Sequence, residues 1–128
     1  MLNPSGNKKN LVADNRLDEF TEFRQHLRYA KRRDKKCNLT LEDLRVQWDK
    51  QKGICPYLKI KLDNSTWNGK PKDPVWTASL DRINSSKGYI RGNIQFVSMC
   101  MNFMKYTMSH RRMLSVLRRI ADEWFVFP

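Results

Sequence analysis

Polar side chains suited to a metal ion and a phosphate lie within one stretch of the chain, from Ser79 to Lys105. Asp81 ends an apolar run, Asn93 opens the next one, and Asn102 follows in a helix-like segment. A carboxylate and an amide carbonyl are hard oxygen ligands that suit Mg²⁺ or Mn²⁺, with waters and phosphate oxygens completing the shell. The stretch therefore predicts a divalent-metal site with Asp81 and Asn102 as its protein ligands.

The composition indicates a polyanionic partner. The chain has 128 residues, a net charge of +12 and a pI of about 10.0, which favour nucleic acid or an anionic membrane. No apolar run approaches the roughly 18 residues of a membrane span, and the first ten residues lack the apolar segment of a signal peptide. We therefore expect no membrane association and an intracellular protein.

The cysteines give no pattern for a disulfide framework or a four-cysteine zinc site. Cys37, Cys55 and Cys100 are odd in number, and no two of them form a C-x-x-C pair. Three reduced thiols, partly buried as small apolar groups, are the expected state. A structural zinc ion is not expected.

The elements that must position the metal site follow from periodicity and capping signals. Residues 1–15 read as a flexible basic arm, and 16–128 as a single domain. We expect a basic helix over about 17–36, a helix over about 41–52, a hairpin over 54–62, a two-strand and helix core over about 77–108, and a C-terminal helix over about 110–124. Trp76 and Leu80 are expected to be buried, as is a C-terminal stripe of Met113, Val116, Leu117, Ile120 and Trp124. The predicted fold class is α+β.

Basic residues gather on the first helix, in the loop after Asp81 and on the last helix. A basic helix face is commonly only solvated, but Asp34 is the one acid between Arg24 and Lys36, so phosphate contact is favoured here. The predicted nucleic-acid contacts are Arg24, Arg28, Lys31, Arg32, Lys35, Lys87, Arg91, Arg111 and Arg112, with Arg118 and Arg119 further along the last helix.

Together, Asp81, Gly88, Asn93, Asn102 and Lys105 resemble the motif of the HNH nucleases, the ββα-metal class. That motif is a strand ending in an Asp-His pair, a loop with a Gly-rich turn, an Asn opening a second strand, and a helix carrying Asn or His followed by Lys. The Ser-Leu-Asp-Arg-Ile form is similar to a phage and bacterial subgroup, and the resemblance covers most of the chain from about residue 20.

The resemblance implies a small ββα-metal core with a β-hairpin, flanked by N-terminal and C-terminal helices, and metal-dependent cleavage of DNA. It implies that Asn93 fixes the loop through backbone hydrogen bonds and that Lys105 faces the phosphate. Double-stranded DNA is the expected partner, Mg²⁺ or Mn²⁺ the expected cofactor, and the cytoplasm or nucleoid of a bacterial or phage-infected cell the expected setting. A homodimer or a partner protein is expected if cutting is site-specific.

Two departures from the family pattern have consequences. Where zinc-bearing members have two C-x-x-C pairs, this chain keeps Cys55 but has Leu58, Ser98 and Met101 at the other positions. Packing by Leu58, Met101 and Met104 is therefore expected in place of zinc.

The second departure is Arg82, which stands where the family has its general-base histidine. Arginine stays protonated and accepts no proton, so Arg82 is expected to hold the phosphate or to pair with an acid such as Asp43 or Asp63. The candidates for the base are His110, Tyr89, Tyr106, His26 and solvent. Three interpretations remain open: an endonuclease, a nucleic-acid-binding module that has lost catalysis, and a basic interaction protein without nuclease ancestry.

Overall fold

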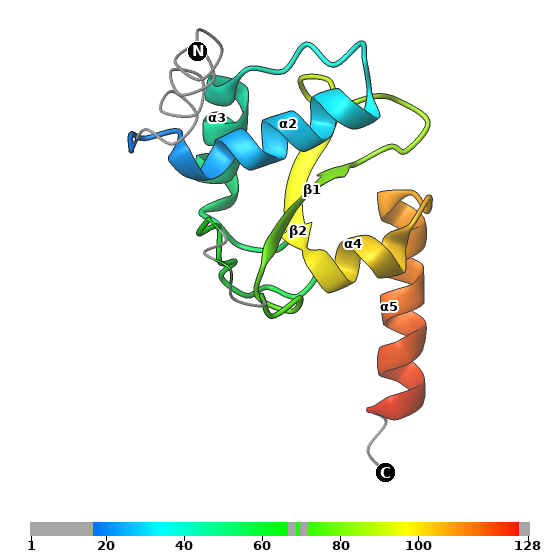
Figure 1. Cartoon of the computed structure of the whole chain (residues 1–128). Helices are drawn as coiled ribbons and strands as arrows, with labels where there is room; N and C mark the ends of the chain where they lie inside the picture. The colour runs from blue at the N-terminus through cyan, green and yellow to red at the C-terminus, as the bar shows by residue number, and fades with distance from the viewer. Residues whose placement is uncertain (1–16, 67–68, 70–71, 126–128) are drawn as a thin grey trace, which may run out of the picture.

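The computed structural model describes residues 17–66, 69 and 72–125, and it shows a mixed α+β chain (Figure 1). Within this part of the chain, one 3-10 turn, four helices and two strands occur. In chain order they are η1 (Thr21–Phe23), α2 (Arg24–Arg33), α3 (Leu41–Gln51), β1 (Ala78–Arg82), β2 (Ile94–Ser98), α4 (Met99–Lys105) and α5 (His110–Trp124).

Helix α3 has clear local start and stop signals. Thr40 caps its first turn: its hydroxyl accepts a hydrogen bond from Asp43 N at 3.2 Å, and the Asp43 carboxylate accepts one from Thr40 N at 2.8 Å. At the other end, Lys52 adopts a left-handed conformation with φ 55° and Gly53 follows with φ 65°. A side chain at Gly53 would also collide with the ring of Trp48, so this position requires glycine.

Strands β1 and β2 form an antiparallel pair in which Leu80 lies opposite Phe96 and Asp81 opposite Gln95. The outer edge of β2 is met by a side chain of α3: Gln51 Nε2 donates to Phe96 O at 2.8 Å, and Phe96 N donates to Gln51 Oε1 at 2.8 Å. A two-stranded sheet is marginal by itself, so this contact and the packing of the helices hold it in place.

Helix α4 begins directly after β2 and packs against both strands, while α2 crosses beside β1 (Figure 1). The core centres on Phe96, which is fully buried. The rings of Phe23, Trp48 and His26 lie around it at centroid distances of 6.0, 5.2 and 5.2 Å. Aromatic packing of this kind adds to the stability from area burial.

Several expected boundaries differ from the structure. The basic helix is shorter than 17–36, because a 3-10 turn precedes α2 and Asp34 is extended with φ −135°. The hairpin over 54–62 is reduced to a single bridge between Ile54 and Lys61. Trp76 is 49% exposed rather than buried. The expected arm, residues 1–15, lies outside the described residues.

The expected buried stripe of α5 is also wrong: only Met113 is fully buried, because most of α5 extends away from the body (Figure 1). Among the described residues, no helix combines the length and the apolar character needed to cross a bilayer.

Candidate metal and phosphate site

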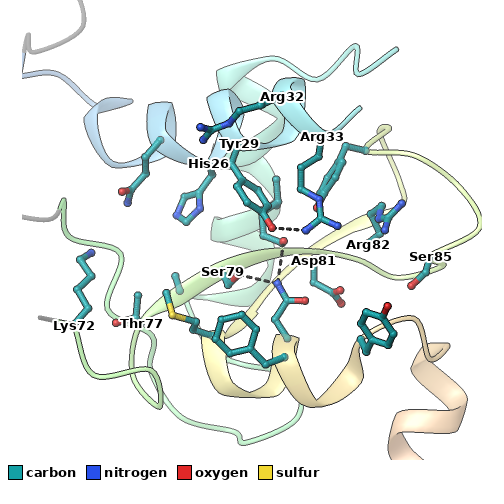
Figure 2. A pocket seen from close by; sticks show the side chains of 18 residues that line it. His26, Tyr29, Arg32, Arg33, Lys72, Thr77, Ser79, Asp81, Arg82 and Ser85 are labelled. Atoms are coloured by element: carbon teal, nitrogen blue, oxygen red, sulfur yellow. Dashed lines mark hydrogen bonds between the residues drawn. The ribbon is translucent and has the colours of Figure 1, made fainter. Parts of the chain in front are cut away.

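A cavity of about 580 Å³ lies between α2, β1 and α4, and we call it the central cavity (Figure 2). Helix α2 covers one side with His26, Tyr29, Arg32 and Arg33, and β1 supplies the facing side. Of the predicted site residues, those that line it are Asp81, Arg82, Asn102, His26, Tyr89, Tyr106 and Arg32. Both predicted metal ligands therefore open onto the same space.

Asp81 is 4% exposed and is held by two donors. Gln95, its neighbour across the sheet, donates from Nε2 to Oδ2 at 2.9 Å. Lys105 Nζ lies 3.2 Å from Oδ1 and 3.1 Å from Oδ2. These contacts fix the carboxylate in one orientation at the wall of the central cavity.

Lys105 does not face the central cavity, contrary to the expectation that it contacts a phosphate. Its side chain is fully buried, and Nζ also donates to the carbonyl of Arg82 at 2.6 Å. The last turn of α4 lies against the sheet, which directs the ammonium group behind Asp81. Lys105 therefore orients and neutralises Asp81.

Asn102 is oriented by its amide nitrogen. Nδ2 donates to Ser79 Oγ at 2.8 Å and to Leu80 O at 3.4 Å, which ties the side chain to the strand that carries Asp81. No described residue donates a hydrogen bond to Asn102 Oδ1. The carbonyl oxygen, the atom that binds a hard cation, is thus the unused end of the side chain.

Asn93 holds the loop between the strands through backbone hydrogen bonds, the role that the resemblance implies. Its Oδ1 accepts from Asn84 N at 2.9 Å, and its Nδ2 donates to the carbonyls of Asn84 at 3.1 Å and Gly88 at 2.9 Å. Asp34, directly after the end of α2, closes the same loop by accepting from Tyr89 N at 3.0 Å, and a side chain at Gly88 would collide with its carboxylate. The loop geometry next to Arg82 is therefore fixed by three side-chain contacts from Asn93 and one from Asp34.

Arg82 places its guanidinium group 5.3 Å from the ring centre of Tyr89 and donates weakly to Lys87 O at 3.4 Å. Within the described residues, Arg82 forms no ion pair with a carboxylate. The two acids that were expected as partners are engaged elsewhere: Asp43 pairs with Arg91 at 2.8 Å, and Asp63 accepts from Ser65 N. Its charge is consequently available at the cavity wall.

The four candidate bases lie in different surroundings. His26 lines the central cavity, and burial lowers its pKa to about 4, so it is neutral near pH 7. However, Figure 2 shows it apart from Asp81, and its Nε2 lies 2.7 Å from Asn64 Oδ1. Burial raises the pKa of Tyr89, which keeps its phenol protonated. Tyr106, at the end of α4, is 80% exposed.

His110 does not line the central cavity and is instead part of a hydrogen-bonded chain behind it. Its Nδ1 lies 2.9 Å from the Tyr57 hydroxyl, which accepts from Gln95 Nε2 at 3.1 Å, and Gln95 in turn binds Asp81. Burial raises the pKa of Tyr57 to about 12. His110 therefore supports Asp81 through two intermediate side chains and is not placed to take a proton from water in the cavity.

The predicted nucleic-acid contacts separate into three groups. Arg24 is 7% exposed and pairs with Asp18 at 2.6 Å, so this prediction is wrong for phosphate binding: the residue faces the protein. Arg91 is exposed but paired with Asp43. The remaining predicted residues are exposed, namely Arg28, Lys31, Arg32, Lys35, Lys87, Arg111 and Arg112.

The structure adds four side chains that the sequence reasoning missed. Tyr29 and Arg33 are hydrogen-bonded to each other at the cavity wall, and Gln95 and Tyr57 form the support behind Asp81. Tyr29 and Arg33 lie three and four residues apart from other cavity-lining residues of α2, such as His26, Arg32 and Tyr29 itself. This helical spacing is the sequence pattern that could have indicated them. Gln95 alternates with apolar residues on a fully buried strand, and an uncharged polar residue there already indicates a buried partner.

The positions that the resemblance to zinc-bearing HNH proteins singled out are packed here. Cys55 is buried and its Sγ accepts from Ser98 N at 3.4 Å. Met101 is buried and Leu58 packs against the core, whereas Met104 is 40% exposed and does not take the expected part. No three His, Cys, Asp or Glu side chains of the described residues gather as a metal-binding group.

Comparison of the chain with protein-family models, curated proteins and solved structures finds no match.

Proposed function

We propose that this chain is a metal-dependent DNA endonuclease with an HNH-type core, formed by β1, β2 and α4. The observation that carries the proposal is the convergence of Asp81 and Asn102 on the central cavity, whose wall also carries Arg32, Arg33 and Arg82. An anionic and a neutral oxygen ligand beside a group of guanidinium groups is an arrangement for a divalent cation and a phosphodiester.

The donor atoms fit a magnesium ion. A carboxylate offers about four lone pairs; Lys105 approaches both oxygens of Asp81, and Gln95 takes a second site on Oδ2, which leaves one site on Oδ1. Asn102 Oδ1 provides the second ligand. With two protein ligands, water and phosphate oxygens complete the shell that Mg²⁺ prefers. When bound, the ion polarises the phosphate and stabilises the leaving oxygen.

The protein side chains would act by holding and orienting the substrate. Arg82, stacked on Tyr89, presents N–H groups at the cavity wall and can stabilise the negative charge that develops on the phosphate. Arg33, steadied by Tyr29, faces the same space. Exposed basic residues of α2, such as Arg28 and Lys31, add contacts to the DNA backbone without reading bases.

No described side chain beside Asp81 is suited to act as a general base, so we propose that solvent accepts the proton. Cutting is then expected to accelerate steadily with pH. Arg82→His restores the family's base at this position, and its activity is expected to level off above the pKa of the introduced imidazole. A well-folded Arg82→His variant that does not cut would show that the guanidinium group is required.

The decisive experiment measures nicking of supercoiled plasmid with Mg²⁺, Mn²⁺ or chelator. Asp81→Asn and Asn102→Leu are expected to lower cutting by at least roughly 100-fold, the scale of losing one transition-state contact. Asp49→Asn, an exposed carboxylate change on α3, is the matched control. Metal-independent cutting, or equal activity in all three variants, would refute the proposal.

The second candidate is a DNA-binding module that has lost catalysis, which the pairing of Asp81 with buried Lys105 favours. For this function, binding is salt-sensitive and plasmid remains intact with either metal. Magnesium binding measured by titration separates the two, because the nuclease requires an affinity that Asp81→Asn removes.

A further inference from the structure

Helix α4 has a buried face and a face that lines the central cavity. The buried face carries Lys105 behind the proposed metal ligands. The cavity face carries Met99, Asn102 and Phe103, and Tyr106 lines the cavity directly after the last residue of the helix. Steps of three and four residues separate these side chains, so they share one side of α4. Asn102 therefore has two aromatic neighbours on the face that it presents to the cavity.

The two rings at this wall are open to solvent. Phe103 is 74% exposed and Tyr106 is 80% exposed, although both line the central cavity. An aromatic face left in water gains free energy when another flat apolar surface covers it. Both rings are therefore available to a ligand that enters the cavity.

The backbone at Tyr106 is strained. Its φ of 50° and ψ of −113° lie on the left-handed side of the φ/ψ map, where a bulky residue is an outlier. Hydrogen bonds fix the turn: Tyr106 N donates to Asn102 O at 3.1 Å, and Met108 N donates to Lys105 O at 2.8 Å. Strained residues of this kind cluster at ligand-binding sites. Here the turn keeps an exposed ring at the cavity wall.

The facing wall of the central cavity is basic. Figure 2 shows Arg32 and Arg33 of α2 on the other side of β1 from α4, and Arg82 of β1 lines the same space. The cavity thus has guanidinium groups on one side and aromatic rings on the other. A nucleic-acid strand has matching chemistry, because its phosphates carry negative charge and its bases offer flat faces. Basic grooves with aromatic side chains bind single strands in this way.

A nucleotide within an intact duplex could not use the aromatic wall. Each base of a duplex is covered on both faces by its neighbours, so a side chain can stack only on a base that has left the stack. An unpaired strand exposes its bases, and stacking on Phe or Tyr tolerates any sequence because every base has a π-face. The two walls together therefore favour an unpaired strand over a paired one.

We propose that the central cavity takes a single-stranded or locally unpaired segment of DNA, whose bases stack on Phe103 and Tyr106. The three arginines of the facing wall hold the phosphates of this segment. The inference rests on the proposed function, because the strand that binds here is the one placed beside the proposed metal ligands for cutting.

Fluorescence anisotropy with the full chain and labelled strands in chelator tests the inference. The probes are an oligothymidine strand, an abasic deoxyribose-phosphate strand of the same length, and a duplex. The abasic strand has the charge of the first probe but no bases, so the wild-type chain is expected to bind it roughly tenfold more weakly. Because the chelator prevents metal-dependent cutting, the result does not depend on catalysis.

Substitution of the rings locates the contact. Phe103→Ala and Tyr106→Ala are each expected to weaken binding of the oligothymidine strand by roughly tenfold, the scale of one lost base stack. Binding of the abasic strand and of the duplex should stay as in the wild type. Phe125→Ala is the matched control, because Phe125 is 66% exposed but does not line the central cavity. Far-UV circular dichroism checks that each variant is folded.

The outcomes separate this inference from the nuclease proposal. Equal binding of the oligothymidine and abasic strands, no binding of either, or ring variants that match the control would overturn the inference, and metal-dependent nicking of plasmid could still be observed. Base-dependent binding without nicking in Mg²⁺ or Mn²⁺ would support the inference and refute the nuclease proposal alone.

Discussion

Replacing Lys105 by methionine tests how much the ion pair between Lys105 and Asp81, behind the central cavity, contributes to stability. The side chain of Lys105 is fully buried and that of Asp81 is 5% exposed, with 3.1 Å between Nζ and Oδ2. Methionine fills most of the same volume but leaves a buried carboxylate without its cation, which costs about 3–5 kcal/mol. Since small domains have roughly 5–15 kcal/mol of stability, this change removes a large part of it.

A double-mutant cycle separates the pair from the packing. Urea unfolding is measured for Lys105→Met, for Asp81→Asn and for both changes together. Each single change leaves one buried charge alone, whereas the double change leaves none, so its cost is expected to fall at least about 2 kcal/mol below the sum of the singles. Additive effects, or single changes below about 1 kcal/mol, are typical of solvated surface pairs and would refute the buried pair.

Three further predictions concern the surroundings of the site. Burial lowers the pKa of the His26 imidazole from 6.5 to about 4. As pH drops from 6.5 to 4, the imidazole therefore gains a proton in the unfolded chain before it does in the folded chain. The free energy of unfolding is expected to fall by roughly 3 kcal/mol over this range. In His26→Gln this acid dependence should disappear, and an unchanged pH profile would contradict it. Asn93→Ala leaves the backbone groups of Asn84 and Gly88 without partners, which should cost about 2–3 kcal/mol and accelerate hydrogen exchange at Asn84 N; protection equal to wild type would argue against this. Burial raises the pKa of Tyr57 from 10.0 to about 12, so the stability that the neutral phenol contributes below pH 10 is lost as pH rises through 12. Tyr57→Phe should remove this alkaline loss, as followed by thermal unfolding against pH.

Local signals predicted the later helices better than the first helix or the hairpin over 54–62, because capping and periodicity are local interactions. The expected helix starts at about 41 and 110 agree with the first residues of α3 and α5, which Thr40 and Ser109 cap in the structure. The resemblance to the HNH motif assigned Asn93 to the loop, and its observed partners, Asn84 and Gly88, lie close to it in sequence.

Burial was the weak part of the prediction, because it depends on which elements meet in space. The stripe of α5 and the ring of Trp76 look like core residues in sequence, yet Trp76, Ile120 and Trp124 are exposed. Only Met113 of this set is fully buried. Lys105 looks like a surface cation, yet helix packing places it behind Asp81. The support through Gln95 and Tyr57 joins segments that are distant along the chain, and no local pattern predicts it.

The contact of Gln51 with both backbone groups of Phe96 has a consequence for assembly. A free strand edge invites another extended segment to continue the ladder, and here one amide side chain occupies the donor and acceptor at the middle of β2. Intermolecular growth of the sheet at this edge would first have to displace Gln51. The amide thus protects the β2 edge of this two-stranded sheet from strand addition.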